Sequence, residues 1–352
     1  MENNKRILVT GAGGFIGGSI VEASYLSGYA NVRAGIRQWS SATRIARFPV
    51  EIVFCDVLDR EQIDNAMDGI SHVIHCAVGD RTVTVEGTQN MLESALNHGV
   101  KRFVHVSTVD VYGHANREVD EASPLRYTGN QYGDSKIDAE KLCWKFYKKG
   151  VPVSIIRPAI VYGPFSKLWT IRFAERLRSG NWGIYKEYGD GICNLIYIDD
   201  LVSGIFLAAS NERAIGEAFN IIGSETITWN QYFLKLNNAM GLPQLKEIRP
   251  TSSKINSAVL IPFRSSAKYV LSRYGDLVMK VYARYGTAKT IMKQAEKTMK
   301  TTPVMAELNL YSQRAHYSSK NARDTLGYKP QYDVDKGVAI SVSWLEHHGF
   351  LS

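Results

Sequence analysis

The sequence has few cysteines and prolines and no long hydrophobic run. Its four cysteines, Cys55, Cys76, Cys143 and Cys193, are far apart and form no Cys-x-x-Cys pair, which argues against a disulfide framework or a structural zinc site. We therefore predict no metal site. No apolar stretch approaches the roughly 18 residues of a membrane-spanning helix. The 10 prolines and 29 glycines form no repeat, and 45% of the residues are hydrophobic, which excludes collagen-like and disordered architectures.

The composition is that of a globular protein with enough chain for a substantial core. At about 150 residues per domain, 352 residues allow two domains or one large fold with an appended lobe. The chain begins Met-Glu-Asn-Asn-Lys-Arg and enters an apolar strand pattern at Ile7, which leaves no room for a signal peptide. Together with the scattered cysteines, this start favours a reducing compartment, and we predict a cytoplasmic protein.

Positive charge is concentrated in one part of the chain. The whole sequence has 42 Lys+Arg and 34 Asp+Glu, a net charge of +8. Residues 245–330 contain 16 of the basic and 5 of the acidic residues, a net charge of +11, so the rest of the chain has a net charge of −3. This contrast predicts two regions with different roles.

Short β-branched runs alternate with segments of helical period, which is typical of parallel strands joined by crossover helices. The expected strands cover residues 6–10, 32–36, 52–55, 72–75, 102–107, 153–157, 195–198 and 218–222, and the expected helices cover residues 16–27, 63–67, 86–97, 131–148 and 200–210. Most of these strands are too apolar to have one face in water. The sequence predicts an α/β fold: a doubly wound parallel Rossmann sheet with a smaller, mostly helical C-terminal substrate lobe.

The domain boundaries follow from these elements. We expect the dinucleotide-binding domain at residues 1–165, which also receives residues 195–222. The substrate-binding lobe is expected at residues 166–194 and 223–352, and it includes a basic amphipathic helical segment at residues 266–300.

A glycine motif follows the first strand directly. Gly11, Gly14 and Gly17, with Phe15 and Ile16 between the last two, open the first helix. The first glycine permits a tight turn, the second lets the backbone approach a pyrophosphate, and the third lets helix and strand pack closely. The free N–H groups at the helix start attract phosphate. We predict that these five residues bind a dinucleotide.

The ends of the second and third strands bear on the choice of cofactor. An NAD-selective fold usually has an acidic residue at the end of the second strand, whereas this sequence has Arg37, followed by Ser40 and Ser41. An arginine can pair with the 2′-phosphate of NADP, so we favour NADP over NAD; an arginine that stacks on adenine without discriminating is the alternative. Asp56, followed by Val57, is placed to accept from the adenine amino group or to cap the next helix.

A tyrosine and a lysine four residues apart form the candidate catalytic pair. Tyr132 and Lys136 lie on one face of the expected helix. A neighbouring ammonium favours the phenolate form of tyrosine, so the pair can exchange a proton with a hydroxyl or carbonyl during hydride transfer. Thr108 ends the preceding strand at the same sheet edge. A surface pair without function is the alternative.

Together these motifs resemble the extended short-chain dehydrogenase/reductases, also called the NAD-dependent epimerase/dehydratase family. The resemblance covers nearly the whole chain and is carried by the following motifs: Thr10-Gly11-x-x-Gly14-x-x-Gly17, Asp56, Glu86-Gly87-Thr88, Ser107-Thr108, Tyr112-Gly113, Tyr132-x-x-x-Lys136, Arg157-Pro158, Tyr162-Gly163-Pro164, Tyr197-Ile198-Asp199-Asp200-Leu201 and Leu326-Gly327-Tyr328-Lys329-Pro330.

The resemblance implies a role for each matching residue. Tyr132 is the expected acid/base, Lys136 holds the nicotinamide ribose and lowers the Tyr132 pKa, and Thr108 hydrogen-bonds the reacting oxygen. Cys76-Ala77 and Pro158 are expected to line the nicotinamide pocket. A homodimer formed through residues 86–97 and 131–148 also suits the family.

Departures from the family's sugar-active members favour a less polar substrate. Sugar 4,6-dehydratases have an Asp-Glu pair where this chain has Val109 and Asp110, and sugar epimerases usually have an asparagine where it has Ile160. They also tend to have a phosphate-binding arginine where residues 191–194 have none. The Arg157-Pro158-Ala159 sequence is more similar to the hydroxysteroid dehydrogenase and ketone-reductase side of the family.

Residues 266–300 leave several roles open. Apolar residues recur there at three-to-four spacing, with Arg273, Lys280 and Arg284 off the stripe. This pattern is typical of a helix packed on the lobe with a solvated basic face, of a lid over an apolar substrate, or of peripheral contact with an anionic membrane. Nucleic-acid binding is not expected, because no recognition motif accompanies the charge.

Three functions remain in view. The first is an NAD(P)-dependent oxidoreductase that interconverts a secondary alcohol and a ketone on a small molecule. The second is a nucleotide-sugar epimerase with tightly bound NAD. The third is a non-catalytic protein that senses the cofactor, against which the intact Thr108, Tyr132 and Lys136 argue. Neither the substrate nor the direction of reaction follows from the sequence.

Overall fold

The computed structural model describes residues 5–249 and 301–351, and it divides into two compact units. The first unit comprises residues 1–162, 194–225 and 315–334, and the second comprises residues 163–193, 226–314 and 335–352. The predicted amphipathic segment 266–300 lies outside the described residues.

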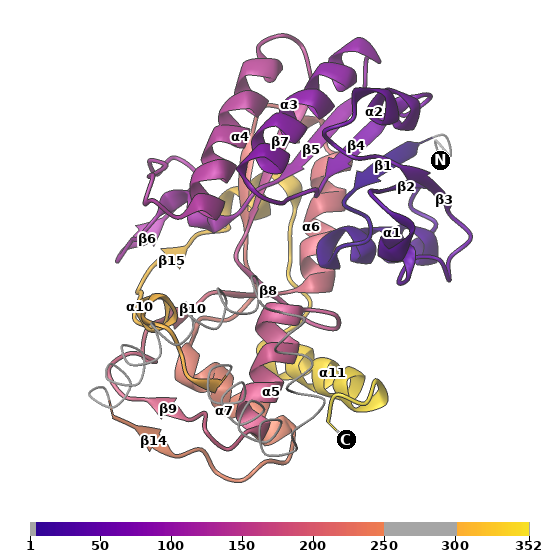
Figure 1. Ribbon diagram of the computed structural model, residues 1–352. Coiled ribbons are helices and arrows are strands. Elements are labelled where there is room, and N and C mark those ends of the chain that lie inside the picture. The colour runs from indigo at the N-terminus through magenta and orange to yellow at the C-terminus, as the bar shows by residue number, and fades with distance from the viewer. Residues whose placement is uncertain (1–4, 250–300, 352) are drawn as a thin grey trace, which may run out of the picture. The chain divides into compact units, whose positions relative to one another are not determined.

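A seven-stranded parallel sheet forms the centre of the first unit (Figure 1). Its spatial order is β12-β7-β5-β4-β1-β2-β3, and every pairing is parallel. The strands are β1 (Arg6–Thr10), β2 (Asn31–Ile36), β3 (Glu51–Phe54), β4 (His72–His75), β5 (Arg102–Val106), β7 (Val153–Pro158) and β12 (Ala218–Ile221). The strand order reverses beside β1, so the carboxyl ends of β1 and β4 flank the crevice in which such sheets bind ligands. The predicted Rossmann fold is confirmed.

Helices cover both faces of this sheet (Figure 1). The helices of the first unit are α1 (Phe15–Ser27), α2 (Arg60–Met67), α3 (Arg81–Asn97), α4 (Gln131–Tyr147) and α6 (Ile198–Ser210). Helix α3 packs against α2 and α4 in one layer, and α1 packs against α6 in the other. Strands β4, β5 and β7 are buried along their whole length, as expected for parallel strands between two helical layers.

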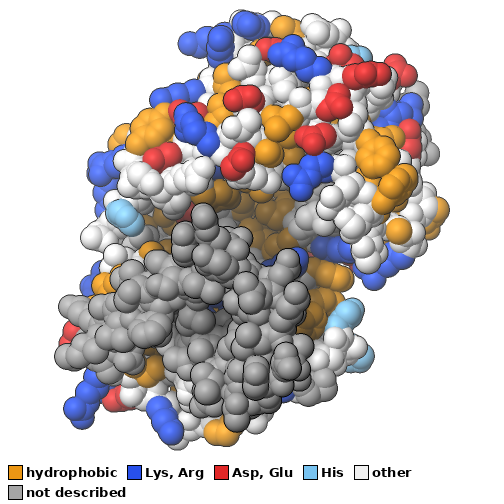
Figure 2. Space-filling model, in the orientation of Figure 1, with side chains coloured by type: hydrophobic (Ala, Val, Ile, Leu, Met, Phe, Trp, Pro, Cys, Tyr) orange, Lys and Arg blue, Asp and Glu red, His pale blue; other side chains and the backbone are white. Residues whose placement is uncertain are grey.

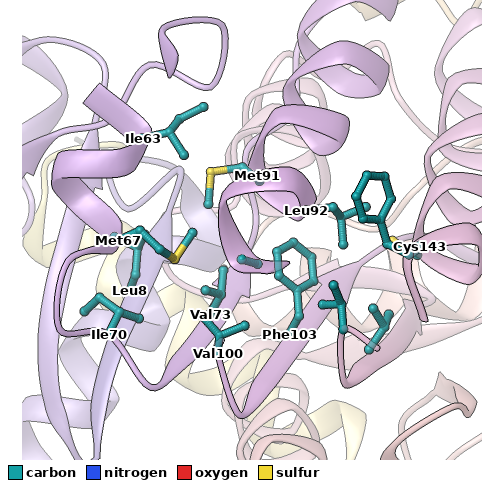
Figure 3. Close-up of a cluster of buried hydrophobic side chains, with 14 of the residues drawn as sticks. Leu8, Ile63, Met67, Ile70, Val73, Met91, Leu92, Val100, Phe103 and Cys143 are labelled. Carbon is teal, nitrogen blue, oxygen red and sulfur yellow. The ribbon is translucent and has the colours of Figure 1, made fainter. Parts of the chain in front are cut away.

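A hydrophobic core lies between the sheet and the layer of α2, α3 and α4 (Figure 3). Met67 from α2, Met91 and Leu92 from α3, and Phe103 from β5 are completely buried in it. Burying each such side chain contributes about 1.5–3 kcal/mol. This core fixes the helices whose first turns reach the ligand-binding edge of the sheet.

Short pairings complete the first unit. Strand β8 (Ile160–Tyr162) pairs with β11 (Leu195–Tyr197), and β6 (Glu118–Val119) pairs with β15 (His316–Tyr317). The Tyr328 hydroxyl donates to the Ile222 carbonyl at 2.9 Å. These contacts place residues 315–334 in the first unit, whereas the sequence analysis placed them in the substrate lobe.

The second unit is mainly helical and has an aromatic core. Its helices are α5 (Arg172–Arg178), α7 (Trp229–Ala239), α10 (Met305–Tyr311) and most of α11 (Val334–His347), and its strand pairs are β10 (Ile192–Cys193) with β13 (Ile227–Thr228) and β14 (Glu247–Ile248) with β9 (Ile184–Tyr185). The Arg176 guanidinium is 1% exposed, lies over the rings of Phe173 and Trp182, and pairs with Glu307 at 2.9 Å. Helix α10 is thereby tied to α5.

Two further observations on the described residues concern the length of the helices and the charge on the surface. No helix in residues 5–249 and 301–351 is both long and apolar enough to span a bilayer. Lys, Arg, Asp and Glu side chains are interspersed on the visible face of the first unit (Figure 2).

Candidate active site

The glycine turn after β1 has the geometry of a phosphate cradle. Gly11 has φ +64°, and a Cβ on Gly17 would lie 2.3 Å from the Gly11 carbonyl oxygen, so neither position tolerates another side chain. Helix α1 starts at Gly14 without a side-chain cap. The N–H groups of its first turn are therefore available to an anion.

A cavity of about 330 Å³ lies over this turn. It is lined by Gly11, Gly13, Gly14, Gly35, Ile36, Arg37, Ser41, Cys55, Asp56, Val57, Cys76, Ala77, Val78 and Val83. The lining brings together the predicted Gly11, Gly14, Arg37, Asp56, Val57, Cys76 and Ala77. Phe15, Ile16 and Gly17 form the first turn of α1 instead, and Pro158 ends β7 away from the lining.

Sequence analysis missed Gly13 and Ser41 as a contacting pair. A Cβ on Gly13 would lie 2.3 Å from the Ser41 carbonyl oxygen, so the short helix η1 (Trp39–Ala42) packs directly on the glycine turn. The adjacent Gly13-Gly14 pair was the signal in the sequence. Val78, which is 49% exposed, was also missed; it follows Ala77 directly.

Arg37 is a free cation at this cavity. Among the residues that the structure describes, Arg37 has no ion pair or hydrogen bond, whereas the nearby arginines Arg44 and Arg47 pair with Glu22. An unpaired guanidinium lining a cavity suits an anionic ligand group. The charge at the end of β2 is thus positive and uncompensated.

Asp56 does not cap the next helix. The cap of α2 is Asp59, whose carboxylate accepts from the Gln62 N–H at 3.1 Å. Asp56 accepts from the Leu58 N–H at 3.0 Å and lines the cavity. The helix-cap alternative of the sequence analysis is therefore wrong, and Asp56 is available to the ligand.

The three candidate catalytic residues converge at the carboxyl end of β5. Asn130 caps α4 by accepting from the Tyr132 N–H at 3.1 Å, which places Tyr132 in the first turn and Lys136 one turn later. Thr108 follows β5 and opens the short helix η2 (Val109–Tyr112). The Thr108 hydroxyl lies near the Tyr132 hydroxyl and affects its pKa.

Tyr132 has a phenol group that can donate a proton. The residue is 42% exposed. Packing of protein atoms around its hydroxyl, together with the Asp110 carboxylate, raises the Tyr132 pKa to about 12, and the Thr108 hydroxyl opposes the shift. A Cβ on Gly133 would lie 3.5 Å from the Asp110 Cβ, so Asp110 and the start of α4 are in contact. The phenol is neutral at physiological pH.

Lys136 is buried beneath the site. Its ammonium donates to the Val106 carbonyl at 2.8 Å, and burial lowers its pKa to about 8. The sequence analysis expected Lys136 to lower the Tyr132 pKa, whereas in this structure the Tyr132 pKa is raised and its electrostatic neighbour is Asp110. Lys136 lies near Cys76, which lines the cavity. The candidate catalytic residues therefore lie close to the cavity.

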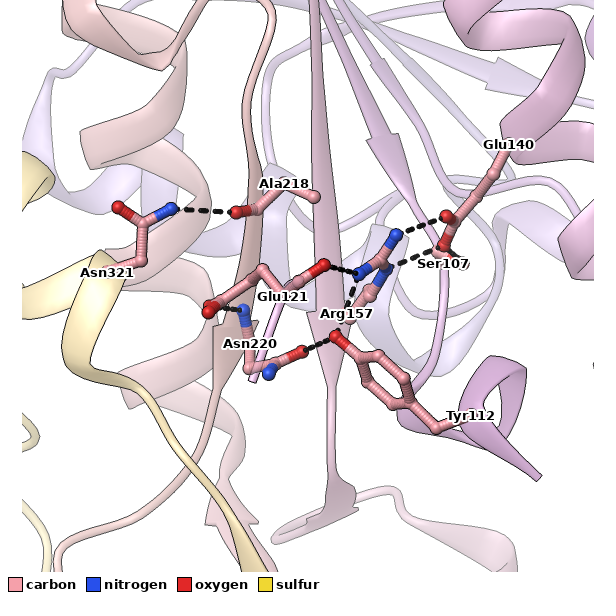
Figure 4. Close-up of polar contacts among 8 residues, drawn as sticks. All are labelled: Ser107, Tyr112, Glu121, Glu140, Arg157, Ala218, Asn220 and Asn321. Atoms are coloured by element: carbon pink, nitrogen blue, oxygen red, sulfur yellow. Dashed lines mark hydrogen bonds and ion pairs between the residues drawn. The ribbon is translucent and has the colours of Figure 1, made fainter. Parts of the chain in front are cut away.

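A buried polar network lies behind these residues (Figure 4). The Arg157 guanidinium binds both oxygens of Glu140, at 3.0 and 2.7 Å, and donates to the Tyr112 hydroxyl at 2.7 Å. Tyr112 in turn donates to Asn220 at 2.7 Å, and Ser107 donates to Glu140 at 2.5 Å. Sequence analysis did not single out Glu140, although it lies one helical turn beyond Lys136 on the same face.

The described residues contain no group of three or more His, Cys, Asp or Glu side chains that could hold a metal ion. The groups that the site offers to a ligand are the uncapped start of α1, the Arg37 guanidinium, the Asp56 carboxylate and the Thr108 and Tyr132 hydroxyls. An uncapped helix start accepts a diphosphate, and the cavity beside it offers Asp56 and Arg37 to a nucleoside. A dinucleotide fits this arrangement.

Comparison with known proteins agrees with this geometry. A model of the NAD dependent epimerase/dehydratase family matches residues 7–221. Isoform 2 of the 3beta-hydroxysteroid-dehydrogenase/decarboxylase of Arabidopsis thaliana is 23% identical over 85% of this chain, and the chain spans 52% of that protein's length. Sterol demethylase protein B of Methylococcus capsulatus is 29% identical over 67% of this chain and 75% of its own.

The fold also matches solved structures. The UDP-glucuronic acid 4-epimerase of Bacillus cereus, solved in complex with NAD, superposes with a TM-score of 0.70. The match covers 97% of this chain and 99% of that protein, at 19% sequence identity. At 19% identity this match shows that the two proteins share a fold.

Proposed function

Because this chain belongs to the NAD-dependent epimerase/dehydratase family, we propose that it is an oxidoreductase that interconverts a secondary alcohol and a ketone on a moderately apolar small molecule. Membership of the family, expected from the motifs, is confirmed by the family match. The observation that carries the proposal is the convergence of Thr108, Tyr132 and Lys136 at the carboxyl end of β5, where Thr108 affects the Tyr132 pKa and the Lys136 ammonium donates to the Val106 carbonyl. These three groups supply what carbonyl reduction requires: a proton donor, a partner for the reacting oxygen and a cation.

Each residue has a defined role in the proposed reduction. When bound, a nicotinamide cofactor would supply the hydride for the carbonyl carbon. Neutral Tyr132 donates its hydroxyl proton to the carbonyl oxygen, which becomes the alcohol, while Thr108 hydrogen-bonds the same oxygen. The tyrosinate regains a proton from solvent before the next turnover. Oxidation of the alcohol is the reverse of these steps.

We propose NADP as the cofactor. Gly11, Gly14 and the first turn of α1 would hold the diphosphate, and Asp56 would hold the adenosine. Arg37 supports a 2′-phosphate, because it is positive and has no partner among the described residues. Lys136 would hold the nicotinamide ribose.

The chemistry around Thr108 and β8 supports an apolar substrate. Val109 replaces the first acid of sugar dehydratases, and Ile160 at the start of β8 cannot hold a diphosphate. Two relatives with the names of steroid and sterol enzymes are in accord with this choice. The four cysteines are all unpaired, which supports the cytoplasm as the proposed compartment.

The proposal is tested by cofactor stoichiometry. The purified chain is assayed with NADPH and a panel of steroid and other cyclic ketones, and small molecules that co-purify are identified by mass spectrometry. Consumption of exchangeable NADPH one-for-one with a ketone is the expected result. Tightly retained NAD, together with isomerisation of a UDP-sugar without added cofactor, would establish the epimerase alternative instead.

A further inference from the structure

The loop after β4 forms one wall of the cavity over the glycine turn. Cys76, Ala77 and Val78 of this loop all line that cavity. Helix α3 holds the end of the loop, because the Thr84 hydroxyl donates to the Gly79 carbonyl and accepts from the Gly79 N–H, both at 3.3 Å. The loop is therefore tied to the first turn of α3.

A second, longer connection runs through the sheet. His75 ends β4 and lies directly opposite Thr10, the last residue of β1. The His75 Nδ1 is 2.8 Å from the Thr10 hydroxyl, and the Nε2 is 3.1 Å from the Thr88 hydroxyl of α3. All three side chains are completely buried. The Ala77 N–H donates to the Thr10 hydroxyl at 3.3 Å, which brings the connection back to the cavity wall.

The direction of each of these hydrogen bonds follows from the Thr88 hydroxyl, at the α3 end of the connection. The Thr88 hydroxyl donates its one proton to the Thr84 carbonyl at 2.6 Å, so it accepts from His75 Nε2–H. The Nδ1 of a neutral imidazole is then an acceptor, and it accepts from the Thr10 hydroxyl. Thr10 is left with lone pairs for the Ala77 N–H. Burial lowers the His75 pKa to about 3, which agrees with a neutral ring.

The connection ends at a close contact between Ala77 and the glycine turn. A Cβ on Gly11 would lie 3.0 Å from the backbone of Ala77, so the position of Ala77 decides how much room the glycine turn has. Helix α3 holds the opposite wall as well: Gly87 approaches Val57 so closely that a Cβ would lie 2.4 Å from its Cγ2, and Asn90 donates to the Val57 carbonyl at 3.1 Å.

We propose that Thr88, His75 and Thr10 form a directed hydrogen-bond relay that positions Ala77 against the glycine turn, so that Thr88 is a positioning residue for dinucleotide binding although it does not line the cavity. The inference rests on the proposed function only in taking the dinucleotide as the ligand. A preorganised wall binds more tightly because no ordering cost remains at the moment of binding.

The relay is tested first by its protonation state, which is independent of any ligand. Nitrogen-15 NMR of histidine-labelled protein, with the His75 signal assigned through His75→Gln, reports the tautomer. The expected result for the unmodified protein is the Nε2–H form from pH 5.5 to 8. In Thr88→Val the acceptor is lost, and the ring is expected to change to the Nδ1–H form, which donates to Thr10. An Nδ1–H form in the unmodified protein overturns the relay.

The second test measures binding of NAD and NADP by calorimetry. Thr88→Val keeps the shape of the side chain without its hydroxyl, and Thr88→Ser keeps the hydroxyl. We expect a roughly tenfold weaker affinity in Thr88→Val and an affinity close to that of the unmodified protein in Thr88→Ser. Thr82→Val, an exposed position at the start of α3, is the control and binds normally.

The outcomes separate the relay from the proposed function. Equal affinity in Thr88→Val and the unmodified protein overturns the relay. Thermal unfolding checks that Thr88→Val is folded, and if it is not, Thr10→Val and Thr10→Ser make the same comparison at the other end. Failure of the unmodified protein to bind either NAD or NADP contradicts the proposed function, while the NMR experiment still decides the hydrogen-bond pattern.

Discussion

Arg157 and Glu140 form a two-point ion pair, with Nε–Oε1 at 3.0 Å and Nη2–Oε2 at 2.7 Å, and both side chains are almost completely excluded from water. The same carboxylate accepts from Ser107, the neighbour of Thr108. Glu140 lies one turn beyond Lys136 on α4. One carboxylate therefore joins β7 to α4 and to the end of β5, and the proposed catalytic residues lie on α4 and directly after β5.

We expect Glu140→Gln to destabilise the protein by about 3–5 kcal/mol, because it leaves the Arg157 guanidinium buried without its counter-charge. Urea unfolding measures the change. The control is Glu93→Gln, which breaks a surface pair with Arg60 whose side chains are 31% and 68% exposed; its cost should be below about 1 kcal/mol. An equal loss of unfolding free energy in Glu140→Gln and Glu93→Gln would contradict the expectation that burial determines the loss.

Lys136→Met should abolish turnover and yet make the protein more stable at pH 7, by about 1–3 kcal/mol. The pKa of Lys136 is lowered to about 8 in the folded protein, below its ordinary 10.5. The unfolded chain therefore binds more protons, and the unmodified protein gains stability as the pH rises from 8 to 10.5. Urea unfolding at pH 7 and pH 10 should show the advantage of the variant shrinking with pH. Lys145→Met, at an exposed position on the same helix, should change neither property.

Tyr132→Phe should lower kcat about 10²–10⁴-fold with little effect on cofactor affinity, since it removes the hydroxyl that is the proposed proton donor and keeps the aromatic ring. Steady-state kinetics and calorimetry measure the two quantities separately. Tyr127→Phe is the matched control: Tyr127 is 52% exposed and its hydroxyl contacts Asp138 and Lys141. Unchanged kcat in Tyr132→Phe would refute its role.

Cofactor affinity should fall as the pH rises through about 8. Lys136 is charged below its lowered pKa and neutral above it, so its hold on the ribose hydroxyls weakens in alkaline solution. The Tyr132 phenol stays protonated in this range, because its pKa is raised to about 12. Calorimetry with NADP from pH 6.5 to 9.5 measures the effect. In Lys136→Arg the affinity should not decline with pH, and the same decline in that variant would assign it to another group.

Arg37→Gln should weaken NADP binding about 10–100-fold and leave NAD binding nearly unchanged. Competition between the two cofactors, followed by fluorescence, measures the ratio of affinities. Arg47→Gln is the control, because Arg47 pairs with Glu22 and does not line the cavity. A loss of affinity that is equal for NAD and NADP would show that Arg37 contacts the adenosine rather than a 2′-phosphate.

Local features of the sequence predicted local features of the structure well. Strands β1 and β4 have the predicted bounds, and the glycine turn is at the predicted site. Helix α3, expected from residue 86, begins at Arg81 because the Asp80 side chain caps it by accepting from the Val83 N–H. Residues 82–85 are all β-branched and therefore have low helix propensity, so the sequence pattern did not indicate this start.

Contacts between distant segments could not be predicted in the same way. Thr10 and His75 are 65 residues apart, and nothing in either neighbourhood indicates the other. Residues 315–334 lie in the first unit because β15 pairs with β6 and Tyr328 reaches Ile222. A two-residue strand has no periodicity to detect. The candidate pair Tyr132 and Lys136 could be recognised in the sequence because both residues lie within a single helix.

The two cysteines that line the cavity, Cys55 and Cys76, have thiols of low reactivity. Burial raises the pKa of Cys55 and of Cys76 to about 12, so both thiols stay protonated under cellular conditions. Peroxides and alkylating agents attack the thiolate. An oxidant therefore reacts only slowly with the Cys55 and Cys76 thiols beside the glycine turn.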